Sequence, residues 1–146
     1  PSIPQGSQRK TGQKNRRKKK EKFLQEICKI VNKKEFGNWG EKYAWNLLKK
    51  AGYRFLTKNF RCKLGEIDIV AIDRDTLVFV EVKTRYSRKF GKPEEAVTKR
   101  KLRKIKQVGE YFTKINSGLP KKKRIDVVAI EITNGAVSSA KIIKAT

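Results

Sequence analysis

The chain has 146 residues, of which 38 are lysine or arginine, 14 are aspartate or glutamate and none is histidine, so its net charge is +24. This length suits a single domain with one hydrophobic core, and the charge predicts a polyanionic partner, with nucleic acid favoured over an anionic membrane surface. The absence of histidine excludes every mechanism that needs imidazole as a base or a metal ligand, and leaves carboxylates, lysines and a metal ion as candidates.

The first 35 residues predict two segments outside the domain. Residues 1–20 show no apolar periodicity and predict a disordered basic arm, which would follow phosphates, act as a solubilising tail or serve as a localisation signal. Residues 21–35 carry apolar side chains at helical spacing and predict a short amphipathic helix. The basic residues of the arm that we expect to contact nucleic acid are Arg16, Arg17, Lys18, Lys19 and Lys20.

Residues 36–146 predict the folded domain, which opens with a helix from Asn38 to Ala51. Asn38 followed by Glu41 resembles a capping box, and Gly52 is a typical stop for a helix. Glu41 also lies on the same side of the helix as its apolar residues. It is therefore either a partner of the helix cap or a functional carboxylate that faces the core, and local sequence leaves both open.

After this helix the apolar residues recur with the period of strands, then of a helix, then of strands again. The second helix is expected to start at Thr98 and to end at Gly118-Leu119-Pro120, and Asn134-Gly135 is a signal for a hairpin. The expected strands are Tyr53–Arg61, Gly65–Asp73, Leu77–Thr84, Arg124–Thr133 and Ala136–Ile143. This order predicts an α/β (α+β) fold in which helices flank a mixed central sheet.

Two of the predicted strands carry acidic residues within apolar runs. Glu81 and Lys83 are two apart, so they project from the same face of their strand, and the preceding strand carries Glu66 and Asp68. If the loop between the strands has an even number of residues, such as Arg74-Asp75, Asp68 and Glu81 share a face. They would then be opposed, with Cβ atoms about 4.5–5.5 Å apart. A loop with an odd number of residues would place them on opposite faces.

Two carboxylates at this distance repel each other and require a cation. Lys83 provides one charge, but a hard divalent ion suits a pair of carboxylates better, and without histidine we expect Mg²⁺ or Mn²⁺. The predicted reaction is phosphodiester hydrolysis, in which Asp68 and Glu81 hold the metal ion and Lys83 orients the attacking water or stabilises charge in the transition state. Arg85 and Lys101 are expected to contact phosphates.

Several linked motifs cover residues 36–131. They are Gly37-x-x-Gly40-Glu41-x-x-Ala44, Gly65-Glu66-Ile67-Asp68, the run from Asp75 to Arg85, Phe90-Gly91-x-Pro93-Glu94-x-Ala96-Val97-Thr98, and the run from Arg124 to Val128. Together they resemble the YraN family of small bacterial proteins, which is grouped with the PD-(D/E)XK nucleases. The resemblance implies a restriction-endonuclease-like αβββαβ core, here with an extra C-terminal strand and a basic N-terminal extension. It also favours a metal-site or water-positioning role for Glu41.

The resemblance extends to archaeal Holliday-junction resolvases, which points to branched DNA as a substrate. Gln107 and Tyr111 are similar to the QxxxY element of related exonucleases, or are a plain exposed pair on a helix, and Glu66 is a further accessory candidate. Asp126 is expected to be structural. Ile67 stands where the superfamily has its proline, and Arg74 stands where the family often has glycine, which leaves the geometry of the hairpin turn open.

Three functions are consistent with these features. The first is a metal-dependent endonuclease that acts on DNA, with branched or damaged DNA as candidates, and a homodimer would suit cleavage of both strands. The second is a non-catalytic nucleic-acid-binding protein that retains the fold, and the third is an RNA- or ribosome-associated protein. No apolar run is long enough to span a bilayer or to form a signal peptide, so we expect a cytoplasmic, nucleoid-associated protein that binds DNA in preference to RNA.

Overall fold

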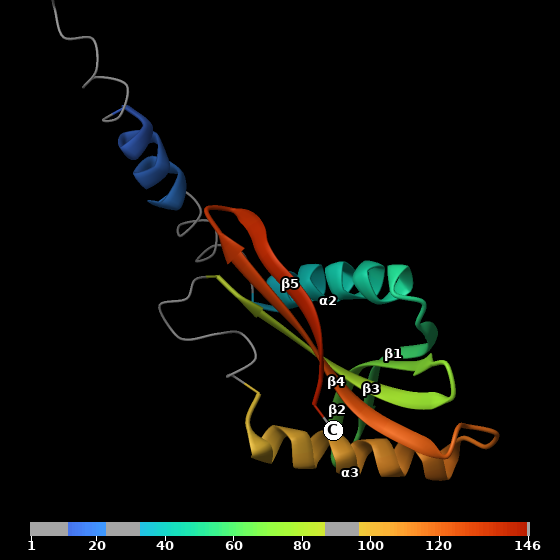
Figure 1. The fold of residues 1–146 in the computed structure, drawn as a ribbon. Coiled ribbons are helices and arrows are strands. Elements are labelled where there is room, and N and C mark those ends of the chain that lie inside the picture. Colours follow the sequence, from blue (N-terminus) through green and yellow to red (C-terminus); the bar gives the residue numbers. More distant parts are fainter. Residues whose placement is uncertain (1–11, 23–32, 87–96, 146) are drawn as a thin grey trace, which may run out of the picture.

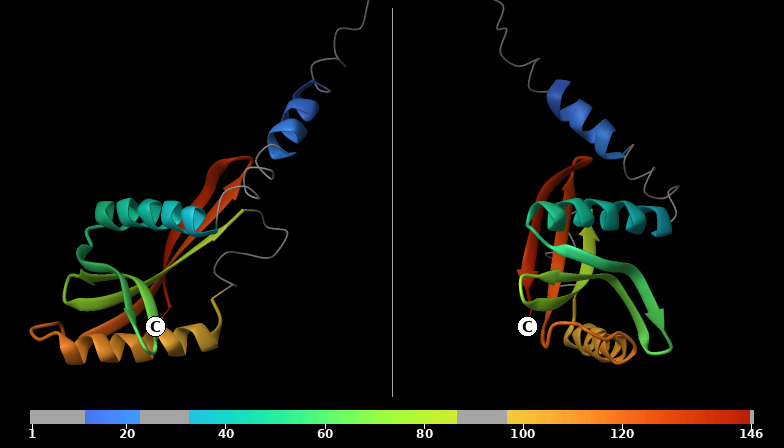
Figure 2. Two further views of the ribbon diagram at one scale, coloured as in Figure 1. Left: turned by 180° about the vertical axis from the view of Figure 1, so that it is seen from behind. Right: turned by 90° about the vertical axis from the view of Figure 1, so that its right-hand side faces the viewer.

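The computed structural model describes residues 12–22, 33–86 and 97–145 of the chain. Within these residues, five strands form one sheet in the order β1-β2-β3-β4-β5. Helix α2 covers one face of the sheet and helix α3 covers the other (Figure 1 and Figure 2). The elements are α2 (Lys33–Lys50), β1 (Arg54–Cys62), β2 (Gly65–Asp73), β3 (Thr76–Arg85), α3 (Lys99–Ile115), β4 (Lys122–Thr133) and β5 (Ala136–Lys144). The predicted fold class is confirmed, with the order αβββαβ followed by an extra strand.

The pairing of the strands follows from how they are connected. β1, β2 and β3 pair antiparallel through short turns, whereas β3 and β4 are parallel and are joined through α3. β4 and β5 form the predicted hairpin. Asn134 and Gly135 at its turn both have positive φ, of 53° and 75°, as two-residue turns that match the twist of the strands require.

Helix α3 packs closely on the sheet. It starts where the sequence predicts, because the Thr98 side chain accepts a hydrogen bond from the N–H of Lys101 at 3.2 Å. A Cβ atom added at Gly109 would lie 2.5 Å from the ring of Phe79 in β3, so only glycine allows this approach. The buried residues of the helix are Ile105, Val108, Gly109 and Phe112.

Helix α2 begins at Lys33, well before the predicted start at Asn38. Asn38 and Glu41 therefore lie inside the helix, and the interpretation of these two residues as a capping box is wrong. Lys33, Lys34 and Glu35 are good helix formers, and the helix runs through Gly37 despite the low helix propensity of glycine. Ala44 and Leu48 are fully buried against the sheet, as the apolar spacing predicts.

A buried ion network joins Tyr53, directly before β1, with β2 and β4. Asp126 is fully buried and accepts hydrogen bonds from the Tyr53 hydroxyl at 2.6 Å and from Nε of Arg124 at 2.7 Å. Arg124 also donates to Asp73 at 2.8 Å. Burial, together with the hydrogen bond to Asp126, raises the pKa of Tyr53. The structural role expected for Asp126 is confirmed, since its charge is fully paired.

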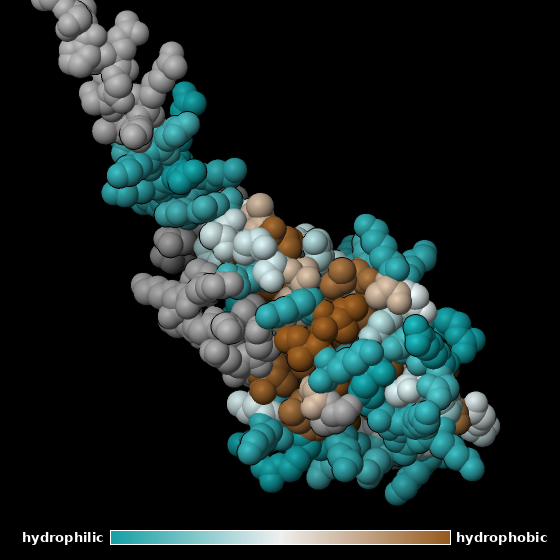
Figure 3. Space-filling model, in the orientation of Figure 1, coloured by the Kyte–Doolittle hydropathy of each residue, from teal (hydrophilic) through white to brown (hydrophobic). Residues whose placement is uncertain are grey.

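Residues 12–22 form a helix in which every residue is exposed, and hydrophilic side chains cover it (Figure 3). This differs from the disordered arm that composition predicts for residues 1–20. Lysine, arginine and glutamine have good intrinsic helix propensity, which needs no apolar face to act. Residues 1–11, and residues 23–32 of the predicted amphipathic helix, lie outside the described residues. Where the chain is described, none of its helices combines the length and apolar character needed to cross a membrane.

Candidate active site

Strands β2 and β3 separate at Asp68. Their pairing ends with Ile69 and Val80, although β3 stays paired with β4 to its end. Beyond this point the backbone N–H of Val82 donates to the Asp68 carboxylate at 2.8 Å, so a side chain of β2 holds β3 where backbone pairing has stopped. Ile67 and Ile69 are two apart but belong to the cores on opposite faces of the sheet. The regular alternation of β2 is therefore interrupted at Asp68.

Asp68 and Glu81 form a hydrogen-bonded pair of carboxyl groups in this opening. The turn between β2 and β3 consists of Arg74-Asp75, so the even loop that the prediction requires is present. Burial raises the pKa of Glu81 to about 8, and the negative charge of Asp68 adds to the effect. Burial also raises the pKa of Asp68, against the opposing hydrogen bonds from Val82 and Glu81. The raised pKa of Glu81 favours its protonated form, whose hydroxyl donates a hydrogen bond to Asp68.

Two lysines lie near this pair. Lys101 comes from the first turn of α3, and its Nζ lies 3.6 Å from Oε1 of Glu81. The positive charges of Lys101 and Lys83 both lower the pKa of Glu81, which places Lys83 near the pair, as the spacing of Glu81 and Lys83 predicts. The sequence suggests Lys101 as a phosphate contact, and the structure adds that it offsets part of the negative charge of the carboxylates.

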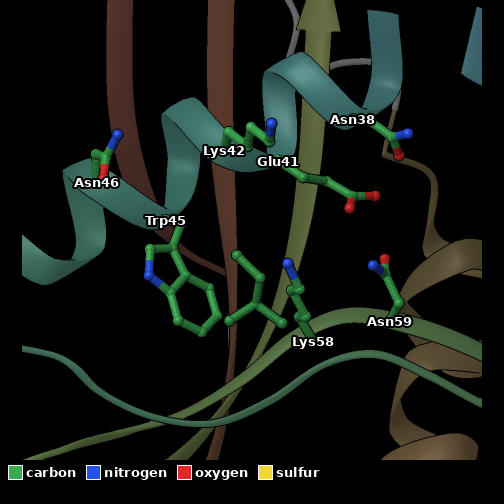
Figure 4. A pocket seen from close by; sticks show the side chains of 8 residues that line it. Asn38, Glu41, Lys42, Trp45, Asn46, Lys58 and Asn59 are labelled. Atoms are coloured by element: carbon green, nitrogen blue, oxygen red, sulfur yellow. The ribbon is translucent and has the colours of Figure 1, made fainter. Parts of the chain in front are cut away.

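Glu41 approaches the same region from α2, on the other face of the sheet. Burial raises the pKa of Glu41, and the negative charge of Asp68 raises it further, while a hydrogen bond with Asn59 opposes the shift. Figure 4 shows its side chain pointing from α2 toward Asn59 and Lys58 of β1. Because α2 begins upstream of Asn38, Glu41 has no part in a helix cap, and the structural alternative that the sequence left open is removed.

Asn59 and Lys58, which sequence interpretation overlooked, complete the surroundings of Glu41. Asn59 has a φ of 54° although it lies inside β1, and its two neighbours pair with the two neighbours of Asp68, so that Asn59 stands opposite Asp68. A left-handed backbone costs about 1 kcal/mol or more for residues other than glycine, and asparagine tolerates it best. The signal in the sequence was a poor strand former in the middle of a strand pattern.

The predicted metal ligands are Glu41, Asp68 and Glu81. Within residues 12–22, 33–86 and 97–145, no three histidine, cysteine, aspartate or glutamate side chains surround a common point as metal ligands do. Asp68 and Glu81 are in contact, whereas Glu41 is coupled to Asp68 through its charge. The available donors are all oxygens, the type that hard divalent cations prefer. A metal ion at this site stays a prediction, and the Asp68–Glu81 pair is its structural basis.

Arg85 and Glu66 lie at the edges of the cluster. Arg85 ends β3, and its Nε is buried without a hydrogen-bond partner among the described residues. Glu66 is half exposed and forms an ion pair with Arg61 at 3.1 Å. The position of Arg85 is consistent with a phosphate contact. The carboxylate of Glu66 is already paired with Arg61 of β1.

Gln107 and Tyr111 are both exposed on α3. The Tyr111 ring lies against Phe60 of β1, with ring centroids 6.4 Å apart. The structure gives this pair no contact with the carboxylates that would distinguish it from an ordinary exposed pair. The basic residues of the arm, from Arg16 to Lys20, are exposed on the helix of residues 12–22.

The fold and the cluster together define an α+β domain with buried carboxylates at the point where two strands of a mixed sheet part. Residues 40–130 match the model of the family described as "Uncharacterised protein family UPF0102". This match covers more than half of the chain, so the chain belongs to the UPF0102 family. The resemblance to YraN-like proteins is confirmed at the level of the family, and the matched segment contains Glu41, Asp68, Glu81, Lys83 and Lys101.

Relatives of high identity carry the same family description. A UPF0102 protein of Caldicellulosiruptor saccharolyticus is 53% identical over 100 residues, which cover 68% of this chain and 85% of the relative. A UPF0102 protein of Caldanaerobacter subterraneus subsp. tengcongensis is 40% identical over 114 residues, or 78% of this chain and 93% of the relative. One of Syntrophomonas wolfei is 42% identical over 112 residues, or 77% and 97% of the two chains.

Proposed function

We propose that this protein is a metal-dependent nuclease of the PD-(D/E)XK superfamily that hydrolyses phosphodiester bonds in DNA, with branched or damaged DNA as candidate substrates. The observation that carries the proposal is the buried Asp68–Glu81 pair at the opening between β2 and β3, with Lys83 and Lys101 beside it. Burying two carboxyl groups side by side costs free energy, and the fold alone does not require it. A catalytic role accounts for the arrangement.

The donor set fits a hard divalent cation such as Mg²⁺ or Mn²⁺. Asp68 and Glu81 would hold the ion, and Glu41 would bind it or orient a coordinated water. Such an ion, when bound, supplies charge that polarises the scissile phosphate and lowers the pKa of a coordinated water. Mg²⁺ is commonly held by only one or two carboxylates together with water and substrate phosphate, so a third close protein ligand is not needed.

The lysines of the cluster have distinct tasks in this proposal. Lys83 shares the electrostatic surroundings of Glu81 and would orient the attacking water or stabilise the negative charge that develops on the phosphate oxygens. Lys101 offsets part of the negative charge of the Asp68–Glu81 pair before a substrate binds. Its position in the first turn of α3 lets it exchange this contact for one with a phosphate.

The charge of α3 supports a nucleic-acid substrate. The segment from Lys99 to Lys106 has lysine or arginine at six of its eight positions, and the first turn of the helix contains no acidic residue. Cations near a helix N-terminus are opposed by the helix dipole, so this composition is unfavourable for the isolated helix. A phosphate backbone bound along α3 would offset that cost, and the net charge of +24 favours the same partner.

A non-catalytic nucleic-acid-binding protein is the second candidate function. Two observations favour it. In the described part of the chain, no three ligand side chains are arranged for a metal ion, and Lys101 already offsets part of the negative charge of the Asp68–Glu81 pair. In this case the basic surfaces would bind DNA or RNA, and the carboxylate pair would be a remnant of the fold.

Cleavage and binding assays on matched substrates separate the two functions. Linear duplex, single-stranded and four-way-junction DNA, and RNA of the same sequence, are incubated with the full chain in Mg²⁺, Mn²⁺ or EDTA. The nuclease proposal predicts shortened DNA products with either metal and none in EDTA. Tight binding without cleavage of any substrate in either metal would refute it and leave the binding function. Paired cuts on both strands would in addition support a homodimer.

A further inference from the structure

A cavity of about 530 Å³ lies between α2 and β1. Its size is within the range of sites that bind small molecules and is ample for one nucleotide. Glu41 is part of its wall, so the cavity reaches the acidic cluster from the face of the sheet that α2 covers. Its other side chains have no role in the proposed hydrolysis, and their chemistry indicates what the cavity binds.

Trp45 forms a rigid aromatic wall of this cavity. Its indole is stacked on Phe55, with ring centroids 3.5 Å apart and planes that differ by 10°, which holds the ring in one orientation. Figure 4 shows the indole extending from α2 toward β1, and Lys58 of β1 also lines the cavity. An aromatic ring fixed in this way is a surface on which nucleobases stack whatever their sequence.

Three asparagines lie around the cavity. Asn38 and Asn46 come from α2, and Asn59 comes from β1 (Figure 4). Each amide offers both a hydrogen-bond donor and an acceptor, the combination that pairs with the edges of bases. Lys58 adds a positive charge that suits a phosphate. An aromatic wall, amides and a lysine are together the set of groups that recognises a nucleotide whose base is free of a partner.

The cavity is adjacent to the carboxylate pair. Glu41 lines the cavity and also senses the negative charge of Asp68, and Asn59 stands opposite Asp68 across β1 and β2. A nucleotide in the cavity would therefore be next to the opening between β2 and β3. A base within a duplex cannot enter, because its edge is paired and both of its faces are stacked.

We propose that the cavity between α2 and β1 receives an unpaired nucleobase next to the phosphate on which the acidic cluster acts. The identity of the ligand as nucleic acid rests on the proposed function. The inference narrows the substrate class to nucleic acid with at least one unpaired nucleotide, as in single strands, branch points and damaged duplexes.

Fluorescence of Trp45 tests this inference in the full chain. The chain has two tryptophans, Trp39 and Trp45, so a Trp39→Phe background leaves Trp45 as the single reporter. This protein is titrated in EDTA with a single-stranded DNA tetranucleotide and with the same tetranucleotide carrying one abasic position. We expect the intact oligomer to quench the emission of Trp45 and to bind about tenfold more tightly than the abasic one, the value of one stacked base.

Variants of the asparagines that line the cavity test whether the preference for the intact oligomer arises there. In the same background, the double variant Asn38→Leu, Asn46→Leu should bind the intact oligomer about tenfold more weakly and the abasic oligomer unchanged. Asn15→Leu, at an exposed position of the helix of residues 12–22, is the matched control and should change neither affinity. Equal affinities of the unsubstituted background for the two oligomers, or an emission from Trp45 that does not respond, would overturn the inference.

The result is independent of catalysis because EDTA removes divalent ions. A protein that cleaves DNA with Mg²⁺ but binds intact and abasic oligomers equally refutes only the base-binding cavity. A protein with base-dependent binding that cleaves nothing refutes only the proposed nuclease function and retains the cavity as a nucleotide site.

Discussion

The carboxyl group of Glu81 changes its charge close to neutral pH, because burial and the negative charge of Asp68 raise its pKa from the ordinary 4.5 to about 8. Between these two values the folded chain holds a proton on Glu81 that the unfolded chain releases. The protonated group therefore stabilises the fold fully below about pH 4.5, and this contribution is lost as the pH rises through about 8.

Removing this titration should flatten the pH dependence of stability. We expect the Tm of the wild type, measured by calorimetry in EDTA, to fall from pH 5 to pH 8.5 by more than that of Glu81→Gln, whose amide stays neutral. Glu110→Gln, an exposed position of α3, should follow the wild type. If Glu81→Gln loses as much Tm as the wild type over this range, Glu81 does not hold the proton.

Asp126 and Asp75 both form ion pairs with basic residues at less than 3 Å, but only Asp126 is buried. Asp126→Ala removes the buried partner of Arg124 and Tyr53 and leaves Asp73 as the remaining carboxylate of Arg124, which should lower the free energy of unfolding in urea by about 1.5–3 kcal/mol. Asp75→Ala removes an exposed pair with Lys122 and should change it little. If both variants lose a similar free energy of unfolding, burial does not determine how much the ion pair of Asp126 contributes to stability.

Part of the candidate site could be predicted from single residues. The even loop and the contact of Asp68 with Glu81 were predicted, but the two residues meet where the strands no longer pair, and not as an opposed pair of a regular ladder. The spacing of two placed Lys83 near Glu81. Asn59 could not be predicted, because its position depends on a left-handed backbone that strand patterns do not reveal. The contact of Lys101 with Glu81 depends on how α3 docks, which no local pattern encodes.

At the scale of elements, the strands were predicted better than the first helix. Alternating apolar residues and the Asn134-Gly135 turn are strong local signals, and β2 has the predicted bounds. The start of α2 was predicted wrongly, because the capping-box pattern of Asn38 and Glu41 lies inside the helix and not at its start. The helix continues upstream to Lys33, through Gly37 and Asn38, although both residues have low helix propensity.

The docking of α3 on the sheet depends on one glycine, which two alanine substitutions test. Gly109→Ala places a methyl group against the Phe79 ring and should lower the free energy of unfolding by about 1–3 kcal/mol. Gly37→Ala, in α2, meets nothing within 4 Å and should raise it by about 0.5–1 kcal/mol. Urea denaturation measures both. If both substitutions raise the free energy of unfolding, the close approach of α3 to β3 is contradicted.

At the scale of the whole molecule, the net charge of +24 predicts nucleic-acid binding that is strongly salt-dependent. Neutralising two exposed cations of α3 in Arg100→Gln, Lys104→Gln should weaken binding to duplex DNA and reduce the slope of log affinity against log salt by about two. Lys49→Gln, an exposed lysine of α2, is the matched control. Fluorescence anisotropy at several salt concentrations gives the slopes. An unchanged slope in the α3 variant would show that the DNA phosphate backbone does not bind along α3.

The carboxylate pair and the basic α3 meet at the contact between Glu81 and Lys101, which connects the charge of the whole molecule with its candidate chemistry. The most direct test is the single-turnover rate of cleavage of four-way-junction DNA in Mg²⁺, compared among wild type, Glu81→Gln and the control Glu110→Gln. We predict that Glu81→Gln lowers the rate at least about a hundredfold while binding is retained, as for loss of a group that stabilises the transition state. The control should cleave at the wild-type rate. Cleavage by Glu81→Gln at the rate of the wild type would contradict the assignment of the active site to Asp68 and Glu81.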